Sequence, residues 1–386
     1  MKTRLFLPTL LFILFTVLPA SAQDDCASRF IGSLKQVSGV KAVEQTEKGY
    51  LAILDSSDKA QSIKAVSQIK ALRKSGSNSR CDYSGTAVAV MNSNLDVIKS
   101  GTADALNKGN IATMLYKYVH DLSPVEVEEN LRGYEVLCEM SPANSYYAAR
   151  KAHYEQRIQL IKDRNEFIAK SEELAAKDRD IIDLKIKKDF YLFVTAGKTP
   201  LATAEKFLSA VAEKTTRPEK KFCIIAYSSD LETRESDCPE EYSDALHETE
   251  EELLMRYVQS LPGYLLQDNV NGYSALKKLN PGVTLYTKKL DAYSYKLDGL
   301  ERFRSLRTAT GNKLISKSST KSSTLFATVS REALQGKSAS ANLKLMETLA
   351  QYYQQSGAPL DRCVLKDPSG TTLGTISCSN SDCSFK

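Results

Sequence analysis

The chain has 386 residues, of which 42% are hydrophobic, and it carries a formal net charge of +5. A single hydrophobic core rarely grows beyond about 250 residues, so this length argues against a one-domain protein and predicts two or three domains. The absence of tryptophan disfavours a sugar-stacking cleft, although 19 tyrosines partly compensate for it.

The first 22 residues have the pattern of a secretory signal peptide. Lys2 and Arg4 precede an apolar run at 5–19, and residues 20–22, Ala-Ser-Ala, supply the small side chains that signal peptidase requires. The run is shorter than the about 20 apolar residues that span a membrane. We therefore expect a soluble protein that is exported, periplasmic or secreted, with no transmembrane span; an uncleaved anchor is the alternative. The chain has no Asn-x-Ser/Thr sequon, which favours a bacterial over a glycosylated eukaryotic protein.

All eight cysteines follow the predicted signal peptide. An even number of cysteines in an oxidising compartment predicts disulfide bonds. Proximity in the sequence favours Cys223 with Cys238 and, less strongly, Cys26 with Cys81, while the other pairings stay open. No C-x-x-C occurs, so neither a redox dithiol nor a zinc ribbon is indicated. The cysteines are Cys26, Cys81, Cys138, Cys223, Cys238, Cys363, Cys378 and Cys383.

Residues 23–102 are predicted to form a small α/β domain. Apolar residues at a spacing of three follow one face of a helix near 63–72, and turn-forming residues separate pairs of strands. The expected elements are a helix at 27–37, strands at 40–45 and 50–55, the helix at 63–72, and a hairpin of strands at 87–91 and 95–100.

Residues 103–187 are predicted to be helical. Ser123, Pro124 and Glu126 form a helix start with a capping box, and residues 141–144 end that helix before a longer, strongly charged helix begins near Ser145. Helical hairpins expose grooves that suit partner helices. We therefore expect this segment to contact a partner protein through Tyr134, Tyr147 and Tyr154.

The spacing of residues in this segment resembles one seam of a tetratricopeptide-type helical array. The residues that carry the resemblance are Asn130, Leu131, Tyr134, Leu137, Pro142, Asn144 and Tyr147. The resemblance covers about a tenth of the chain, and the small-residue positions of that family are not cleanly met. Because solenoids generally need three or more repeats and one seam is evident, an isolated helical hairpin is the alternative.

Residues 188–300 are predicted to form a second α/β domain. Strands at 191–194 and 222–227 flank a helix at 201–211, an order that predicts a parallel pair joined by a crossover. A helix through 253–258 follows an acidic stretch, and further strands are expected at 283–288 and 293–297.

Residues 301–386 are predicted to be a basic section that ends in a disulfide-prone hairpin. The Ser/Thr/Lys-rich residues 316–323 are typical of a loop, a helix is expected at 341–355, and a turn at 367–370 joins strands at 363–366 and 371–377. The whole chain is thus predicted to be a multi-domain α+β protein.

Two short motifs resemble a phosphate-binding loop and a zinc-binding pattern, but each lacks a required residue. Residues 196–199, Ala-Gly-Lys-Thr, would need a glycine at position 192 to form a phosphate-binding loop, and that position is Leu192 within a strand. We expect a tight turn instead, with Thr199 capping a helix that begins at Pro200. His247 begins a partial H-E-x-x-H pattern in which Glu251 replaces the second histidine, so zinc binding is not predicted.

No catalytic, metal-binding or cofactor-binding residue is therefore predicted. The motif Gly-x-Ser-x-Gly of serine hydrolases is absent. A pair of catalytic carboxylates that lie far apart in the sequence stays open, because 47 acidic residues offer too many candidates.

Charge is segregated along the chain. Residues 230–252 hold eleven acidic residues and one basic residue, whereas residues 302–344 hold nine basic residues and one acidic residue. Two solvated surfaces are the simple interpretation; contact with an anionic envelope component is the sharper one. Aromatic residues are too sparse in the basic section for nucleic-acid stacking.

The expected function is that of a non-catalytic, protein-binding or scaffold protein outside the cytoplasm. The alternative is an extracytoplasmic hydrolase with dispersed carboxylates.

Overall fold

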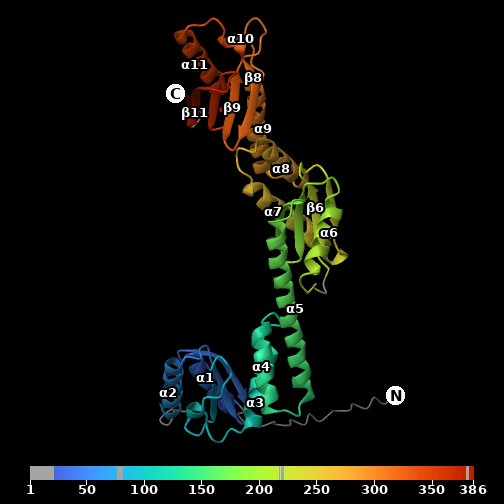
Figure 1. Ribbon diagram of the computed structural model, residues 1–386. Coiled ribbons are helices and arrows are strands. Elements are labelled where there is room, and N and C mark those ends of the chain that lie inside the picture. Colours follow the sequence, from blue (N-terminus) through green and yellow to red (C-terminus); the bar gives the residue numbers. More distant parts are fainter. Residues whose placement is uncertain (1–20, 76–80, 217, 219–220, 380–381) are drawn as a thin grey trace, which may run out of the picture. The chain divides into compact units, whose positions relative to one another are not determined.

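The computed structural model describes residues 21–75, 81–216, 218, 221–379 and 382–386 (Figure 1). Its chain divides into two units, Met1–Lys162 and Asp163–Lys386. Three small sheets and the helices around them confirm the predicted multi-part α+β architecture. Residues 1–20 of the predicted signal peptide lie outside the described residues. Within the described part, no helix is both long and apolar enough to cross a membrane.

The first unit begins with a three-stranded sheet whose middle strand is buried on both faces. Leu51 and Ile53 of that strand point into one core, and Ala52 and Leu54 point into another, as the two-residue period of a strand requires. The first strand pair is antiparallel and the second is parallel. The elements are α1 Ser21–Lys35, β1 Val40–Thr46, β2 Gly49–Leu54, α2 Lys59–Ser75, β3 Val88–Met91 and a 3-10 turn at Lys99–Gly101.

Three helices follow this sheet: α3 Lys108–Asp121, α4 Val127–Met140 and α5 Ser145–Ala175. Asn107 and Asn110 form a capping box at the start of α3, each side chain accepting a hydrogen bond from the backbone of the other. Apolar residues of α3 and α4 share one core with β2, and α5 continues from the first unit into the second.

The second sheet has four strands in the order β4-β5-β6-β7, and its central pair, β5 and β6, is parallel as predicted. Residues 181–187 were expected to be helical and form β4 instead. Its alternating residues Leu184 and Ile186 pack on the core while charged residues lie between them. The elements are β4 Ile181–Lys187, β5 Phe190–Thr195, α6 Pro200–Ala212, β6 Cys223–Ser228, β7 Arg234–Asp237, a 3-10 turn at Glu240–Tyr242 and α7 Ser243–Ser260.

Two further predictions of secondary structure were wrong in the rest of the second unit. The strands expected at 283–288 and 293–297 are one helix, α9, and the loop expected at 316–323 is mostly strand β8. The turn after β8 places Ser322 at φ 51°, which closes a tight hairpin. The elements are α8 Leu266–Leu279, α9 Thr284–Arg304, β8 Ile315–Lys321, β9 Thr324–Val329, α10 Arg331–Leu334, α11 Ala339–Gln355, β10 Arg362–Lys366, β11 Thr372–Ser379 and β12 Asp382–Phe385.

The three sheets repeat one topology. Each contains an antiparallel hairpin, then a helical connection, then a strand parallel to the second strand of the hairpin: β1-β2-α2-β3, β4-β5-α6-β6 and β8-β9-α11-β10. The first strand of each hairpin also carries a register shift near its start, at Val40/Ala42, Ile181/Asp183 and Ile315/Lys317. One module therefore occurs three times along the chain.

The helices between the sheets repeat as well, with a constant shift of 139 positions from Asn130 to Asn269. The side-chain amide of Asn130 donates to the backbone oxygens of Ser123 and Glu126, and that of Asn269 donates to those of Pro262 and Leu265, all at 2.9 Å. We call α3–α5 the first helical copy and α7–α9 the second. The seam that resembled a tetratricopeptide array in the sequence thus occurs at a second position, which the sequence analysis missed.

Candidate functional site

The predicted partner-binding tyrosines lie together on α4 and α5 of the first helical copy. The rings of Tyr134 and Tyr154 stack with their centroids 5.8 Å apart and their planes at 15°. These two side chains are only 1% and 2% exposed, so both belong to the core, whereas Tyr147 is half-buried. Of the three residues, Tyr147 alone reaches the surface, and the role of all three in binding stays a prediction.

Two tyrosines that sequence reasoning missed complete an aromatic surface beside them. The ring of Tyr116 on α3 lies 6.1 Å from that of Tyr146 and 5.6 Å from that of Tyr147. A hydrogen bond with Tyr146 raises the pKa of the Tyr116 hydroxyl, and Tyr146 is 47% exposed. We call Tyr116, Tyr146 and Tyr147 the tyrosine face. The adjacent pair Tyr146-Tyr147 at a helix start was the available signal, because two neighbouring tyrosines point about 100° apart around a helix and widen the aromatic surface.

Two arginines of α5 cover the buried tyrosines. The Arg150 guanidinium lies 5.1 Å from the ring centroid of Tyr154 and 5.6 Å from that of Tyr134, and it donates to the Tyr154 hydroxyl at 3.1 Å. Arg157 lies 5.8 Å from the Tyr154 ring and donates to the backbone oxygen of Pro124 at 2.7 Å. Such cation–π contacts hold both arginines on the buried rings.

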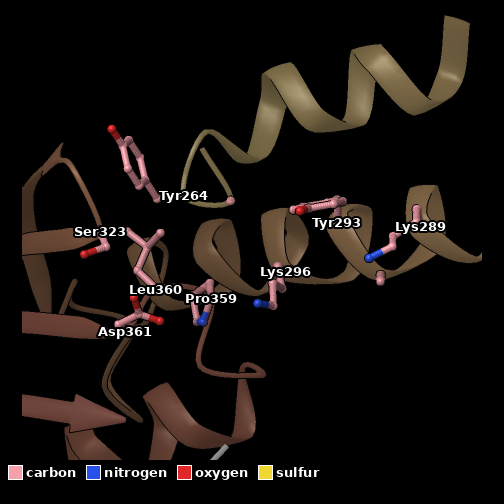
Figure 2. Close-up of a pocket in the computed structure, with 10 residues that line it drawn as sticks. Tyr264, Lys289, Tyr293, Lys296, Ser323, Pro359, Leu360 and Asp361 are labelled. Atoms are coloured by element: carbon pink, nitrogen blue, oxygen red, sulfur yellow. The ribbon is translucent and has the colours of Figure 1, made fainter. Parts of the chain in front are cut away.

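The second helical copy carries a hollow of about 360 Å³ at the corresponding place. Figure 2 shows Lys289, Tyr293 and Lys296 along α9, with Tyr264 and Asp361 toward the sheet. Lys289 and Lys296 correspond to Arg150 and Arg157 by the shift that relates the two copies, and Tyr293 corresponds to Tyr154. The hollow is lined by Gly263, Tyr264, Lys289, Ala292, Tyr293, Lys296, Ser323, Pro359, Leu360 and Asp361.

The turn at residues 196–199 has a carboxylate of the protein bonded at the start of helix α6. Thr199 occupies the N-cap position of α6 without a capping hydrogen bond from its side chain, unlike the prediction. The backbone N–H of Leu201 instead donates to Oε2 of Glu235 at 2.9 Å. A carboxylate of the protein itself therefore satisfies the helix N-terminus that a phosphate would need.

The acidic stretch contains one buried carboxylate, whose hydrogen bonds hold neighbouring elements together. Glu250 on α7 is 1% exposed; it accepts hydrogen bonds from Arg234 Nε at 2.6 Å, from Arg234 Nη2 at 2.7 Å and from the Tyr227 hydroxyl at 2.5 Å. Burial, with Glu250 adding to it, raises the pKa of Tyr227. These bonds tie β6 and β7 to α7. Nearby, His247 Nε2 lies 3.0 Å from the backbone oxygen of Leu279, and among the described residues no group of three or more His, Cys, Asp or Glu side chains is arranged to hold a metal.

Three disulfides form, and they include both favoured pairs, Cys26–Cys81 and Cys223–Cys238. The third joins Cys378 to Cys383. Cys138 and Cys363, which the sequence offered as candidates for further pairings, are free thiols. Burial raises the pKa of the Cys363 thiol to about 12, so this thiol is unreactive in the folded chain.

Comparisons with known proteins give no relative for this arrangement. No protein-family model, no curated protein and no solved structure matches the chain.

Proposed function

We propose that the protein is an exported, non-catalytic scaffold that holds a partner protein on its first helical copy, in the manner of a tetratricopeptide-like array. The observation that carries this proposal is the tyrosine face, whose outermost ring, Tyr146, is almost half exposed. Tyrosine and arginine are enriched among the residues that dominate binding energy at protein interfaces, and Arg150 borders this face.

The repeat supports the same proposal from a second direction. The position of Tyr146 is taken in the second copy by Leu285, which is also 47% exposed. A large apolar side chain thus faces solvent at the start of both α5 and α9. The recurrence of an exposed apolar side chain at the same place in both copies supports a contact with a partner there. The signal-like pattern at residues 1–22 and the three disulfides support export.

Site-specific photocrosslinking tests the proposal. Tyr146 is replaced by photoreactive benzoylphenylalanine in the full-length chain, expressed in a host that exports it, and Lys70 on the exposed side of α2 is replaced in a matched control. We expect a discrete adduct of higher mass from position 146 and none from position 70. We also expect Tyr116→Ala to weaken the adduct, because it removes a ring of the tyrosine face. Equal labelling at both positions, or none at 146, would rule the face out as a binding surface.

A further inference from the structure

The hollow beside α9 has the features of a binding site that the first helical copy lacks. Its floor is formed by helix α9 and its far side by the loop from Pro359 to Asp361 (Figure 2). The walls combine the rings of Tyr264 and Tyr293 and the side chain of Leu360 with two lysines. A concave, partly apolar space with a few charged groups is the usual form of a ligand site.

The two lysines of this hollow are free to meet a ligand. Lys289 and Lys296 lie two helical turns apart on α9 and flank Tyr293. Neither has a hydrogen bond or ion pair within the described part of the chain. Asp361 is the one carboxylate of the lining, so the hollow keeps a net positive charge.

Comparison of the two helical copies explains why the hollow is open. In the first copy the long Arg157 side chain reaches the backbone oxygen of Pro124, and both arginines lie on the Tyr154 ring. In the second copy Lys296 has no planar guanidinium to lie on Tyr293, and Gly263 replaces Pro124. Both copies keep the order cation, tyrosine, cation along the third helix. In the first copy the arginines are bonded within the protein, whereas in the second copy the lysines have no partner among the described residues.

We propose that this hollow binds an acidic side chain of a partner protein, with its carboxylate between Lys289 and Lys296. The carbon chain of that residue would lie against Tyr264 and Tyr293. This inference rests on the proposed scaffold function and extends the contact surface from the first helical copy to the second. Lysines act as point charges that attract any anion, and the apolar ring faces of Tyr264 and Tyr293 favour a carboxylate carried on a carbon chain over inorganic phosphate.

Fluorescence anisotropy with the oxidised protein, residues 23–386, tests this assignment. The probe is fluorescein-labelled hexaglutamate, and labelled hexaglutamine is the neutral control. We expect hexaglutamate to bind and hexaglutamine not to bind. The double variant Lys289→Ala/Lys296→Ala should bind hexaglutamate about tenfold more weakly, because two partly exposed ion pairs are lost. The matched variant Lys278→Ala/Lys288→Ala removes the same charge from exposed positions of α8 and α9 outside the hollow and should change the affinity less than about twofold.

Three results would overturn the assignment. Equal weakening by both double variants would mean diffuse attraction to a basic surface. Unchanged binding by Lys289→Ala/Lys296→Ala would place the peptide elsewhere, and displacement by equimolar inorganic phosphate would make the ligand a free anion. If any of these occurs while position 146 still crosslinks, the scaffold function stands and only the hollow loses its role. All four substituted lysines are exposed, so thermal melting should be unchanged in both variants.

Discussion

The two helical copies keep the same internal contacts and differ on their surfaces. The added Cβ of an alanine at Gly133 would lie 2.3 Å from Val119, and at Gly272 it would lie 2.6 Å from Val258, so both copies need glycine where the first two helices cross. The ring stack has the same centroid distance in both, 5.8 Å for Tyr134–Tyr154 and for Tyr273–Tyr293. The glycines at the helix crossing and the stacked tyrosines are identical in the two copies, whereas many of the residues around them differ.

The divergence concerns side chains near the start of the third helix of each copy. Tyr147 belongs to the exposed tyrosine face, but its counterpart Tyr286 is buried and donates to Glu251 at 2.5 Å. Burial, together with Glu251, raises the pKa of Tyr286 to about 12. The same position therefore adds to an exposed aromatic face in the first copy, whereas in the second copy it is buried and bonded to a carboxylate.

The largest expected effect comes from breaking the ring stack. Tyr134→Ala should lower the free energy of local unfolding by about 3–5 kcal/mol, because it empties the centre of a packed core. Tyr273→Ala should cost about 1 kcal/mol less, since Tyr273 lacks the additional ring contacts that Tyr134 makes with Tyr146 and Tyr147. Hydrogen exchange measured by mass spectrometry on peptides from α4 and α8 reports each copy separately.

The conservative variant Tyr134→Phe keeps the ring and is the control for this comparison. It should cost less than about 1.5 kcal/mol. A loss as large as that of Tyr134→Ala would show that the hydroxyl, and not the stack, stabilises the first copy.

A smaller effect is expected from the glycines at the helix crossing. Gly133→Ala and Gly272→Ala should each destabilise their copy by about 1–3 kcal/mol through overpacking, partly offset by the better helix propensity of alanine. Val119→Ala combined with Gly133→Ala should recover part of the loss, because it removes the methyl groups that the new Cβ meets. Neutral behaviour of both single variants in the same exchange measurement would contradict the close crossing.

The sequence predicted those elements whose periodicity is strong and local. The parallel pair β5 and β6, with α6 between them, follows from the apolar runs, and the disulfide Cys223–Cys238, whose cysteines are 15 residues apart, follows from cysteine spacing. Strand β4 was missed because Asp183, Lys185 and Lys187 look like the continuation of a charged helix, and only the alternate Leu184 and Ile186 reveal a strand. Tyrosine-rich α9 was mistaken for strands because aromatic residues favour strands in isolation, and packing of α9 against α8 outweighs that preference.

The candidate sites depend on contacts that no local pattern contains. The hollow joins three distant stretches of the chain, at Gly263, at the α9 lysines and at Asp361, which meet only after the third sheet packs on α9. The repeat itself was visible in principle, since Asn130, Gly133 and Tyr134 recur at one constant shift. Its few identical positions are separated by unrelated residues, so one seam alone was recognised.

A third prediction concerns a carboxylate that the two copies treat in opposite ways. Burial would raise the pKa of Glu129, but hydrogen bonds from Lys41 and Tyr118 hold it below its usual range, whereas burial alone raises the pKa of the corresponding Asp268. Ionised Glu129 thus contributes stability above its unfolded-state pKa that is lost as the pH falls through its folded-state pKa. Ionised Asp268 reduces stability once the pH exceeds its unfolded-state pKa.

At pH 7, Glu129→Gln should therefore destabilise the first copy and Asp268→Asn should stabilise the second, each by no more than about 1 kcal/mol because both sites are partly exposed. Urea denaturation followed by circular dichroism measures both changes. Both differences should shrink near pH 3, where the wild-type carboxyls take up protons. Changes of the same sign at pH 7 would contradict the assignment of opposite pKa shifts.

The smallest expected effect comes from giving Asp268 of the second copy a lysine partner like the one that Glu129 has in the first. Lys41 lies at the register shift of β1 and bonds Glu129 at 2.5 and 2.7 Å, and the corresponding shift in β4 contains Ile182, which is 49% exposed. Ile182→Lys should place an ammonium group near Asp268 and lower the pKa of that carboxyl, with a gain in stability of about 0.2–1 kcal/mol at pH 7. The reciprocal change, Lys41→Ile, should raise the pKa of Glu129. Nuclear magnetic resonance titration of the two carboxyls measures both shifts, and an unchanged pKa of Asp268 in Ile182→Lys would mean that the two register shifts are not equivalent positions of one repeat.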